Sequence, residues 1–104
     1  MSETLLVDHA RLNAVTNADP ELRAELVELF VQQAERRVLE CETACSDDIQ
    51  LGRAAHALRG LAQSFGAPRL AELALGLEQG KRTPAQFSDL RATLEATLRE
   101  LALL

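Results

Sequence analysis

One histidine near the middle of the sequence, His56, has a glycine four residues away on each side, Gly52 and Gly60. In a helix this spacing places all three residues on one stripe. Each glycine inside a helix costs about 0.5–1 kcal/mol relative to alanine. Because the glycines leave space around the imidazole, the pattern predicts a ring that a bulky group can reach.

Polar residues beside this stripe indicate which group that is. Arg53 and Arg59 lie one turn before and after His56, and Gln63 lies two turns after it. An imidazole nitrogen is a nucleophile, and a guanidinium one turn away can neutralise phosphoryl oxygens through charge-assisted hydrogen bonds. The pattern therefore favours a phosphoryl group that is transferred to His56, with Gln63 as a further donor to that group or to a partner.

Two ordinary explanations compete with this one. A helical histidine is usually a surface residue or a hydrogen-bonded core residue, and glycines also serve close contact between helices. The apolar residues of the segment argue against a core histidine, because they lie on the opposite side of the predicted helix from His56, which therefore points away from the core stripe or lies at its edge. These residues are Leu51, Ala54, Ala55, Leu58, Ala62 and Phe65.

Composition restricts the class of protein. A chain of 104 residues is one domain, 1–104, and its many leucines and alanines with few β-branched residues favour helices. A net charge of −5 with three aromatic residues argues against nucleic-acid binding. No apolar run is long enough to span a bilayer and no signal peptide is visible, so we expect no membrane association and a cytoplasmic protein.

Periodicity and capping residues predict one short helix and four longer ones. Short links favour antiparallel neighbours, so we expect an all-α fold, an antiparallel up-down-up-down four-helix bundle with a short N-terminal capping helix. Asp8 caps the first helix, which ends near Val15, and the second begins at Pro20 and ends near Cys45. The third is capped within Ser46, Asp47 and Asp48 and ends near Phe65, with Gly66 as a left-handed terminator. The fourth begins at Pro68 and ends before Gly80, and Thr83 caps the last, which begins at Pro84.

The predicted core includes Leu12 and Val15 of the short helix and an apolar stripe along the second. That stripe comprises Leu22, Leu26, Leu29, Phe30, Ala34, Val38, Cys41 and Cys45. The two cysteines could form half of a metal site, but no second ligand pair has suitable spacing, so we interpret them as small buried residues.

The segment from His56 to Gly66 resembles the signature of histidine-containing phosphotransfer (HPt) domains, roughly H-x-L-K-G-x-x-x-x-x-G. His56, Leu58, Gly60 and Gly66 match in place, and the helical layout agrees over nearly the whole chain. Arg59 stands where the signature has lysine. The positive charge is retained, but a guanidinium fork differs from an ammonium in its contact geometry.

The resemblance implies a phosphoryl carrier in a multistep phosphorelay, with no kinase activity and no bound nucleotide. The phosphoryl group would pass between an aspartate of response-regulator receiver domains and His56, with a hybrid sensor histidine kinase upstream. We expect a monomer without cofactor or metal of its own, because the Mg²⁺ ion and the aspartate belong to the receiver.

The attacking atom is expected to be Nε2 of His56, which projects farthest from the helix. The turn at residues 66–68 folds the next helix back, so Glu78 can reach the height of His56 and accept a hydrogen bond from Nδ1–H. The alternative is that Glu78 ends its helix in solvent. The second histidine, His9, lies near a chain end without glycine neighbours and is not expected to be phosphorylated.

The surface around His56 is expected to dock the partner. Besides Gly52 and Arg53, we expect it to include the edge of the first helix and part of the second: Ala10, Leu12, Asn13, Gln33 and Arg37.

Three other interpretations remain open. The chain could be a non-catalytic module that binds and inhibits a histidine kinase or receiver, for which His56 would be dispensable. It could be a segment of a hybrid kinase, although an initial Met1 favours a free-standing protein. A carboxylate-bridged metal enzyme would need inward Glu and Glu-x-x-His arrangements, which do not occur.

Overall fold

The computed structural model describes residues 4–104, and within that range it contains helices and no strand. The predicted all-α class is therefore confirmed. The helices are α1 (His9–Val15), α2 (Pro20–Thr43), α3 (Asp48–Phe65), α4 (Pro68–Glu78) and α5 (Pro84–Ala102).

The start of each helix follows from local sequence. Asp8, Asp19, Asp47 and Thr83 each accept a hydrogen bond from a backbone N–H in the first turn of the helix that follows. A proline is the first residue of α2, α4 and α5. The N–H that proline lacks would have no acceptor within the helix at this position, so no hydrogen bond is lost. α4 has no side-chain cap at Ala67, so Pro68 is its main start signal.

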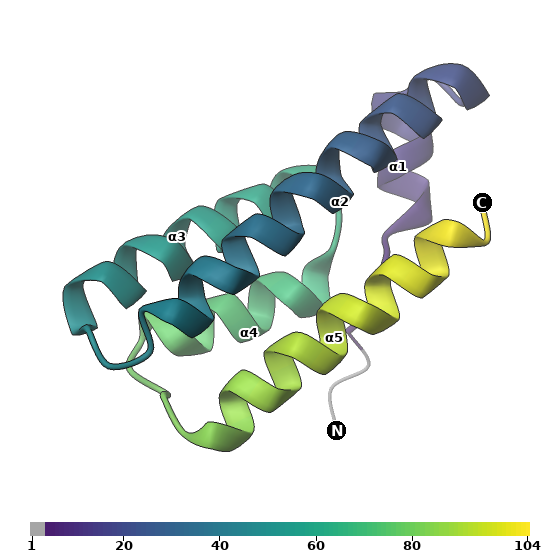
Figure 1. The fold of residues 1–104 in the computed structure, drawn as a ribbon. Helices are drawn as coiled ribbons and strands as arrows, with labels where there is room; N and C mark the ends of the chain where they lie inside the picture. The colour runs from purple at the N-terminus through teal and green to yellow at the C-terminus, as the bar shows by residue number, and fades with distance from the viewer. Residues whose placement is uncertain (1–3) are drawn as a thin grey trace.

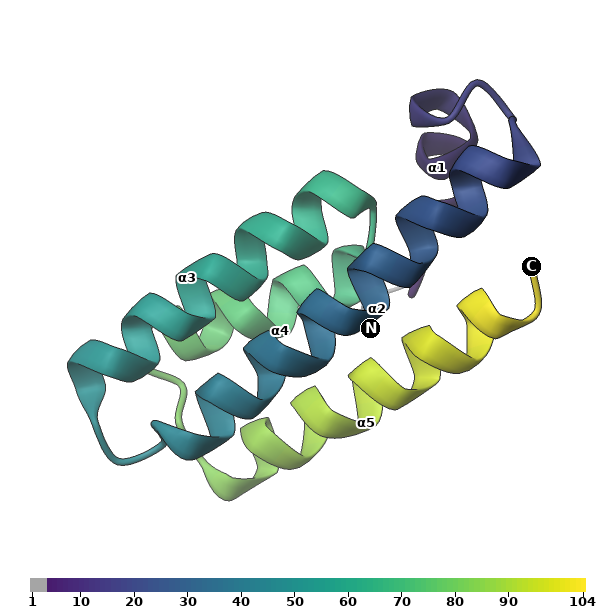
Figure 2. The ribbon, with the colours of Figure 1, turned by 45° about the horizontal axis from the view of Figure 1, so that its top comes forward.

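The four longer helices pack in a closed ring (Figures 1 and 2). α3 packs against α2 and α4, and α5 packs against α4 and α2. α1 lies at one end of the molecule, beside the first turns of α2. Leu12 is the residue of α1 that is buried.

Packing in the ring sets the rotation of α3. Leu51, Ala55, Leu58 and Ala62 have almost no exposed surface and follow the helical repeat. Burying each such leucine contributes about 1.5–3 kcal/mol. These residues hold one side of α3 in the core, so the stripe that contains His56 faces outward.

The link between α3 and α4 is only two residues long, and Gly66 makes it possible. Gly66 ends α3 in the left-handed conformation, with φ at 101°, as predicted. Its carbonyl accepts a hydrogen bond of 2.8 Å from the backbone N–H of Asp8, and Leu5 accepts one of 3.1 Å from Arg69. The N-terminal segment is therefore fastened to this turn.

Four predicted core positions are wrong. Leu22 is about half exposed, because the first turns of α2 extend past the ends of α3 and α4 (Figure 1). Leu29 is also about half exposed, because it lies beside the buried stripe of α2, which passes through its neighbour Phe30. Val15 is half exposed at the end of α1. Cys45 is exposed because α2 ends at Thr43, so Cys45 no longer follows the buried stripe, whereas Cys41 is buried as expected.

We predict that Gly66→Ala lowers the free energy of unfolding more than Gly80→Ala does. Both glycines have positive φ, which costs an L-residue about 1–2 kcal/mol. A methyl group at Gly66 would also lie 3.2 Å from Cδ of Arg11, whereas one at Gly80 meets open space. Urea denaturation of both variants measures the difference, and equal losses would contradict the steric contribution.

Candidate functional site

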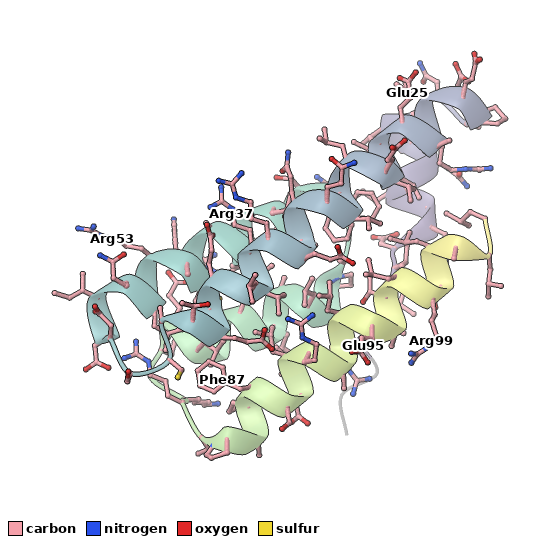
Figure 3. All side chains as sticks on the ribbon, viewed as in Figure 1. Glu25, Arg37, Arg53, Phe87, Glu95 and Arg99 are labelled. Carbon is pink, nitrogen blue, oxygen red and sulfur yellow. The ribbon has the colours of Figure 1, made fainter. Side chains whose placement is uncertain are left out.

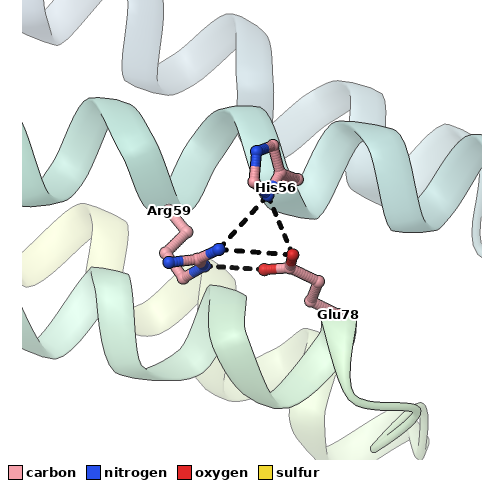
Figure 4. A network of polar contacts seen from close by, with 3 residues as sticks. All are labelled: His56, Arg59 and Glu78. Atoms are coloured by element: carbon pink, nitrogen blue, oxygen red, sulfur yellow. Dashed lines mark hydrogen bonds and ion pairs between the residues drawn. The ribbon is translucent and has the colours of Figure 1, made fainter.

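His56 lies on the outer side of α3, and 68% of its side chain is exposed. Five buried residues on the opposite side of α3 hold it there. Among residues 4–104, Nε2 of the ring has no hydrogen-bond partner, and Figure 4 shows this nitrogen directed away from the neighbouring polar groups. A group approaching from outside can therefore reach Nε2.

The other ring nitrogen of His56 contacts Glu78, the last residue of α4. Nδ1 lies 2.8 Å from Oε1 of Glu78 (Figure 4). The ring is ten residues before the Gly66 turn and the carboxylate is twelve after it, so the two groups reach the same height. The contact expected from the sequence is present, and Glu78 does not end its helix in solvent.

Arg59 contacts the same carboxylate from one turn further along α3. Its Nε donates to Oε2 of Glu78 at 2.7 Å, and its Nη2 lies 3.4 Å from Oε1. Nη2 is also 3.2 Å from Nδ1 of His56. Only a quarter of the Arg59 and Glu78 side chains is exposed.

These distances determine which ring nitrogen of His56 carries the proton. An ionised carboxylate only accepts hydrogen bonds, and a guanidinium only donates them. At 2.8 Å from Oε1, Nδ1 must therefore be a donor, because two lone pairs would repel each other. The approach of Arg59 to Nδ1 is then a contact between two donors that share Oε1. In the neutral ring this leaves the lone pair on Nε2.

Electrostatics keep the Arg59–Glu78 pair charged. The hydrogen bond from Arg59, followed by that from His56, holds the pKa of Glu78 below its ordinary value. The hydrogen bond to Glu78 in turn raises the pKa of Arg59. Glu78 is therefore a carboxylate, and the tautomer argument for His56 applies at neutral pH.

The two glycines beside His56 are not required for packing. A Cβ built at Gly52 or at Gly60 meets nothing within 4 Å. Close contact between helices therefore does not explain these residues. They leave open surface on both sides of the imidazole, as the sequence predicts.

The remaining predicted site residues differ in their exposure to solvent. Arg53 and Gln63 are exposed on α3, and Figure 3 shows Arg53 and Arg37 of α2 on the same side of the molecule. Arg37 donates to Glu40 at 3.0 Å. Leu12 is 1% exposed, so its expected place on the docking surface is wrong: the buried side of α1 carries it into the core.

The other residues predicted at the edge of the docking surface lie on α1 and α2. Ala10 and Asn13 of α1 and Gln33 of α2 are exposed, and Asn13 accepts a hydrogen bond from Arg23. The second histidine, His9, lies on α1, a different helix from that of His56. Its Nε2 is 2.9 Å from Oε2 of Glu100 on α5.

Three exposed apolar residues were missed from the sequence. Leu75 of α4 lines a groove with Gln63 and Ala71, and Leu39 of α2 lines another with Arg37 and Arg53. Ile49 is exposed in the first turn of α3. Each falls outside the buried stripe of its helix. An apolar residue that falls outside the predicted buried stripe of its helix is the signal that could have identified them as exposed.

Within residues 4–104, no cluster of three or more histidine, cysteine, aspartate or glutamate side chains is arranged to hold a metal ion. No helix in that part of the chain combines the length and apolar character needed to cross a membrane.

Comparison with known proteins identifies relatives of this arrangement. The sequence model of the Hpt domain matches residues 25–102. The fold is similar to the crystal structure of histidine-containing phosphotransfer protein B (HptB) from Pseudomonas aeruginosa PAO1, with a TM-score of 0.85 and 21% identity. That likeness covers 94% of this chain and 92% of the other. No curated protein sequence matches the chain significantly.

We predict that the contribution of Glu78 to stability is lost in acid. Its pKa is lowered in the folded state, so the unfolded chain binds its proton first as the pH falls. The stabilisation is complete above the unfolded value of about 4.3 and disappears as the pH falls through the folded value. Urea denaturation from pH 7 to pH 3 should therefore show the wild type losing its advantage over Glu78→Gln. A difference that stays constant with pH would contradict the lowered pKa.

Proposed function

Because the chain belongs to the Hpt domain family, its role is histidine phosphotransfer in a phosphorelay, and we propose that His56 carries the phosphoryl group. One observation carries the proposal. The ring of His56 is exposed at Nε2 while Nδ1–H is held by Glu78, so the nucleophilic lone pair points to solvent.

The proposed reaction needs no proton transfer at the attacking atom. The Nε2 lone pair attacks the phosphorus of an aspartyl phosphate on the receiver, the N–P bond forms, and the P–O bond to the aspartate breaks. The aspartate leaves as a carboxylate, and the ring of His56 becomes positively charged with Nδ1–H retained. Glu78 accepts that hydrogen bond, which becomes stronger when the donor is charged. The reverse steps return the group.

Hpt domains partner with response-regulator receivers and kinases. For this chain we propose a hybrid sensor histidine kinase upstream, action as a monomer, and no binding of nucleic acid. We further propose that the Mg²⁺ ion belongs to the receiver and that this chain works without a cofactor. We also propose a cytoplasmic location, because receivers and kinase domains act there.

We propose that the long helices form an antiparallel up-down-up-down bundle, with α1 across one end. Contacts nested around the α3–α4 turn support this arrangement. His56 is paired with Glu78, and Asp48, farther from the turn on α3, is paired with Arg82 just past α4. Such nesting is expected when a helix folds back along its predecessor through a short link.

The docking surface is proposed to centre on His56, with Gly52 and Gly60 on either side. Arg53 and Gln63 extend it along α3, and Arg37 extends it onto α2. Exposed apolar atoms surrounded by polar ones are suited to a transient partner. Leu75 beside Gln63 provides such atoms in place of Leu12.

The inhibitory binding module is not favoured, since membership of the Hpt family accounts for an accessible histidine that pure binding would not need. Both functions can use the same surface.

We predict that His56→Gln abolishes phosphorylation by a phosphorylated receiver domain, because no other exposed ring nitrogen lies on the docking surface. The measurement is incorporation of acid-labile, base-stable phosphate into the chain. His9→Ala is the matched control and should label normally. Labelling of His56→Gln would refute the assignment. If the wild type is not labelled and His56→Gln still inhibits the kinase or receiver, the binding module would be supported.

We predict that Gly60→Ala stabilises the fold by about 0.5–1 kcal/mol and yet slows phosphotransfer. The new methyl group meets open space in the free protein but occupies surface that the partner needs. Gly76→Ala is the control, because Gly76 is also within a helix and its added methyl faces Gln86 and Lys81. Thermal unfolding and single-turnover transfer rates measure both effects. Equal transfer rates in the two variants would contradict the proposed function of the glycine stripe.

A further inference from the structure

The guanidinium of Arg59 does not lie where the motif predicts. The spacing places a cation beside the phosphoryl group on His56, whereas the structure directs Nε and Nη2 of Arg59 toward Glu78. Figure 4 shows both side chains on the Nδ1 side of the ring, with Nε2 directed away from them.

We infer that Arg59 is a positioning residue: it acts on phosphotransfer through Glu78, which it aims at His56 and whose charge it balances. It does so without contacting the phosphoryl group. This inference rests on the proposed phosphorylation of His56.

The place of Glu78 in α4 explains why the carboxylate needs this support. Glu78 is the last residue of the helix, where the unpaired carbonyl groups produce a partial negative charge. A carboxylate is repelled at that end, and the flexible side chain would turn toward water. Arg59 reverses the preference, since Nε binds Oε2 at 2.7 Å while Nη2 lies 3.4 Å from Oε1.

The charge of Glu78 is the second reason. A phosphoryl group carries a charge between about −1.5 and −2 near neutral pH, and an unbalanced carboxylate on the same ring would repel it. With Arg59 bound, the pair has no net charge. Glu78 can then accept the Nδ1–H hydrogen bond without opposing the negative group at Nε2.

The exposure of the three side chains fits this role. A quarter of Arg59 is exposed, against 68% of His56. Nε and Nη2 of the guanidinium are both directed at Glu78, on the Nδ1 side of the ring, so turning them toward a group on Nε2 would break these contacts. The loss of its hydrogen bonds to an ionised partner opposes that movement.

A double-mutant cycle tests the inference. We expect Arg59→Met to slow single-turnover transfer from a phosphorylated receiver about tenfold, the lower end of the effect known for groups that orient a metal-bound histidine. In a Glu78→Ala background the same substitution should change the rate less than about twofold, because the residue it acts through is gone. Equal slowing in both backgrounds would show direct contact with the phosphoryl group and overturn the inference, as would no slowing in the wild-type background.

Arg91→Met is the matched control for lost stability. Arg91 of α5 binds Glu42 of α2 through Nε at 3.0 Å and through Nη2, so it is also an arginine–carboxylate pair between helices. It is far in sequence from the site and should leave the transfer rate unchanged.

Nitrogen NMR of His56 supplies a readout that a purely structural role would not change. We expect Nδ1 to be protonated in the wild type and the ring to become a mixture of tautomers in Arg59→Met. Arg59→Lys should restore part of the rate and of the tautomer, because an ammonium balances the charge but binds one oxygen at a time. An unchanged tautomer in Arg59→Met would overturn the inference. Failure of the proposed function is distinguishable, since His56→Gln would then still be labelled.

Discussion

The hydrogen bond between Nδ1–H of His56 and Glu78 is the contact on which the site depends, and it joins two helices. Its existence requires that α3 and α4 have a definite rotation and a definite height. Rotation comes from buried residues such as Leu58 on α3 and Leu77 on α4. Height comes from the two-residue link at Gly66. The same packing that stabilises the fold therefore determines which nitrogen of the neutral ring keeps its lone pair.

The polar groups of the site differ in the desolvation penalty that they carry. Nε2 of His56 has no partner among residues 4–104, but because the ring is largely exposed to water this nitrogen carries no desolvation penalty. Arg59 and Glu78 are mostly covered, and each satisfies the charge of the other. The open side of the ring thus stays reactive while the covered side stays rigid. The glycines at 52 and 60 keep the open side clear, at a cost in helix stability that packing of the opposite side outweighs.

Much of the fold was predictable because the sequence marks it locally. Capping residues such as Asp47 and Thr83 begin helices where expected, and Gly66 ends α3. The position of Glu78 beside His56 followed from counting residues around one turn. Errors arose where burial depends on neighbours distant in sequence: the start of α2 extends beyond the bundle, which exposes Leu22. Leu12 was assigned to the docking surface although its buried side was also predicted.

The orientation of Arg59 could not be predicted from spacing, because one turn of helix places its Cβ near His56 but leaves several directions for the long side chain. Only the presence of Glu78 on the facing helix decides among them, since a carboxylate at a helix C-terminus attracts the nearest cation. The consequence reaches the chemistry. In the proposed mechanism, the charges that orient the ring are balanced within the chain, so we expect the partner to supply the charges that balance a phosphoryl group at Nε2. Such a carrier would hold the phosphoryl group without a tight site of its own, which would favour passing the group on.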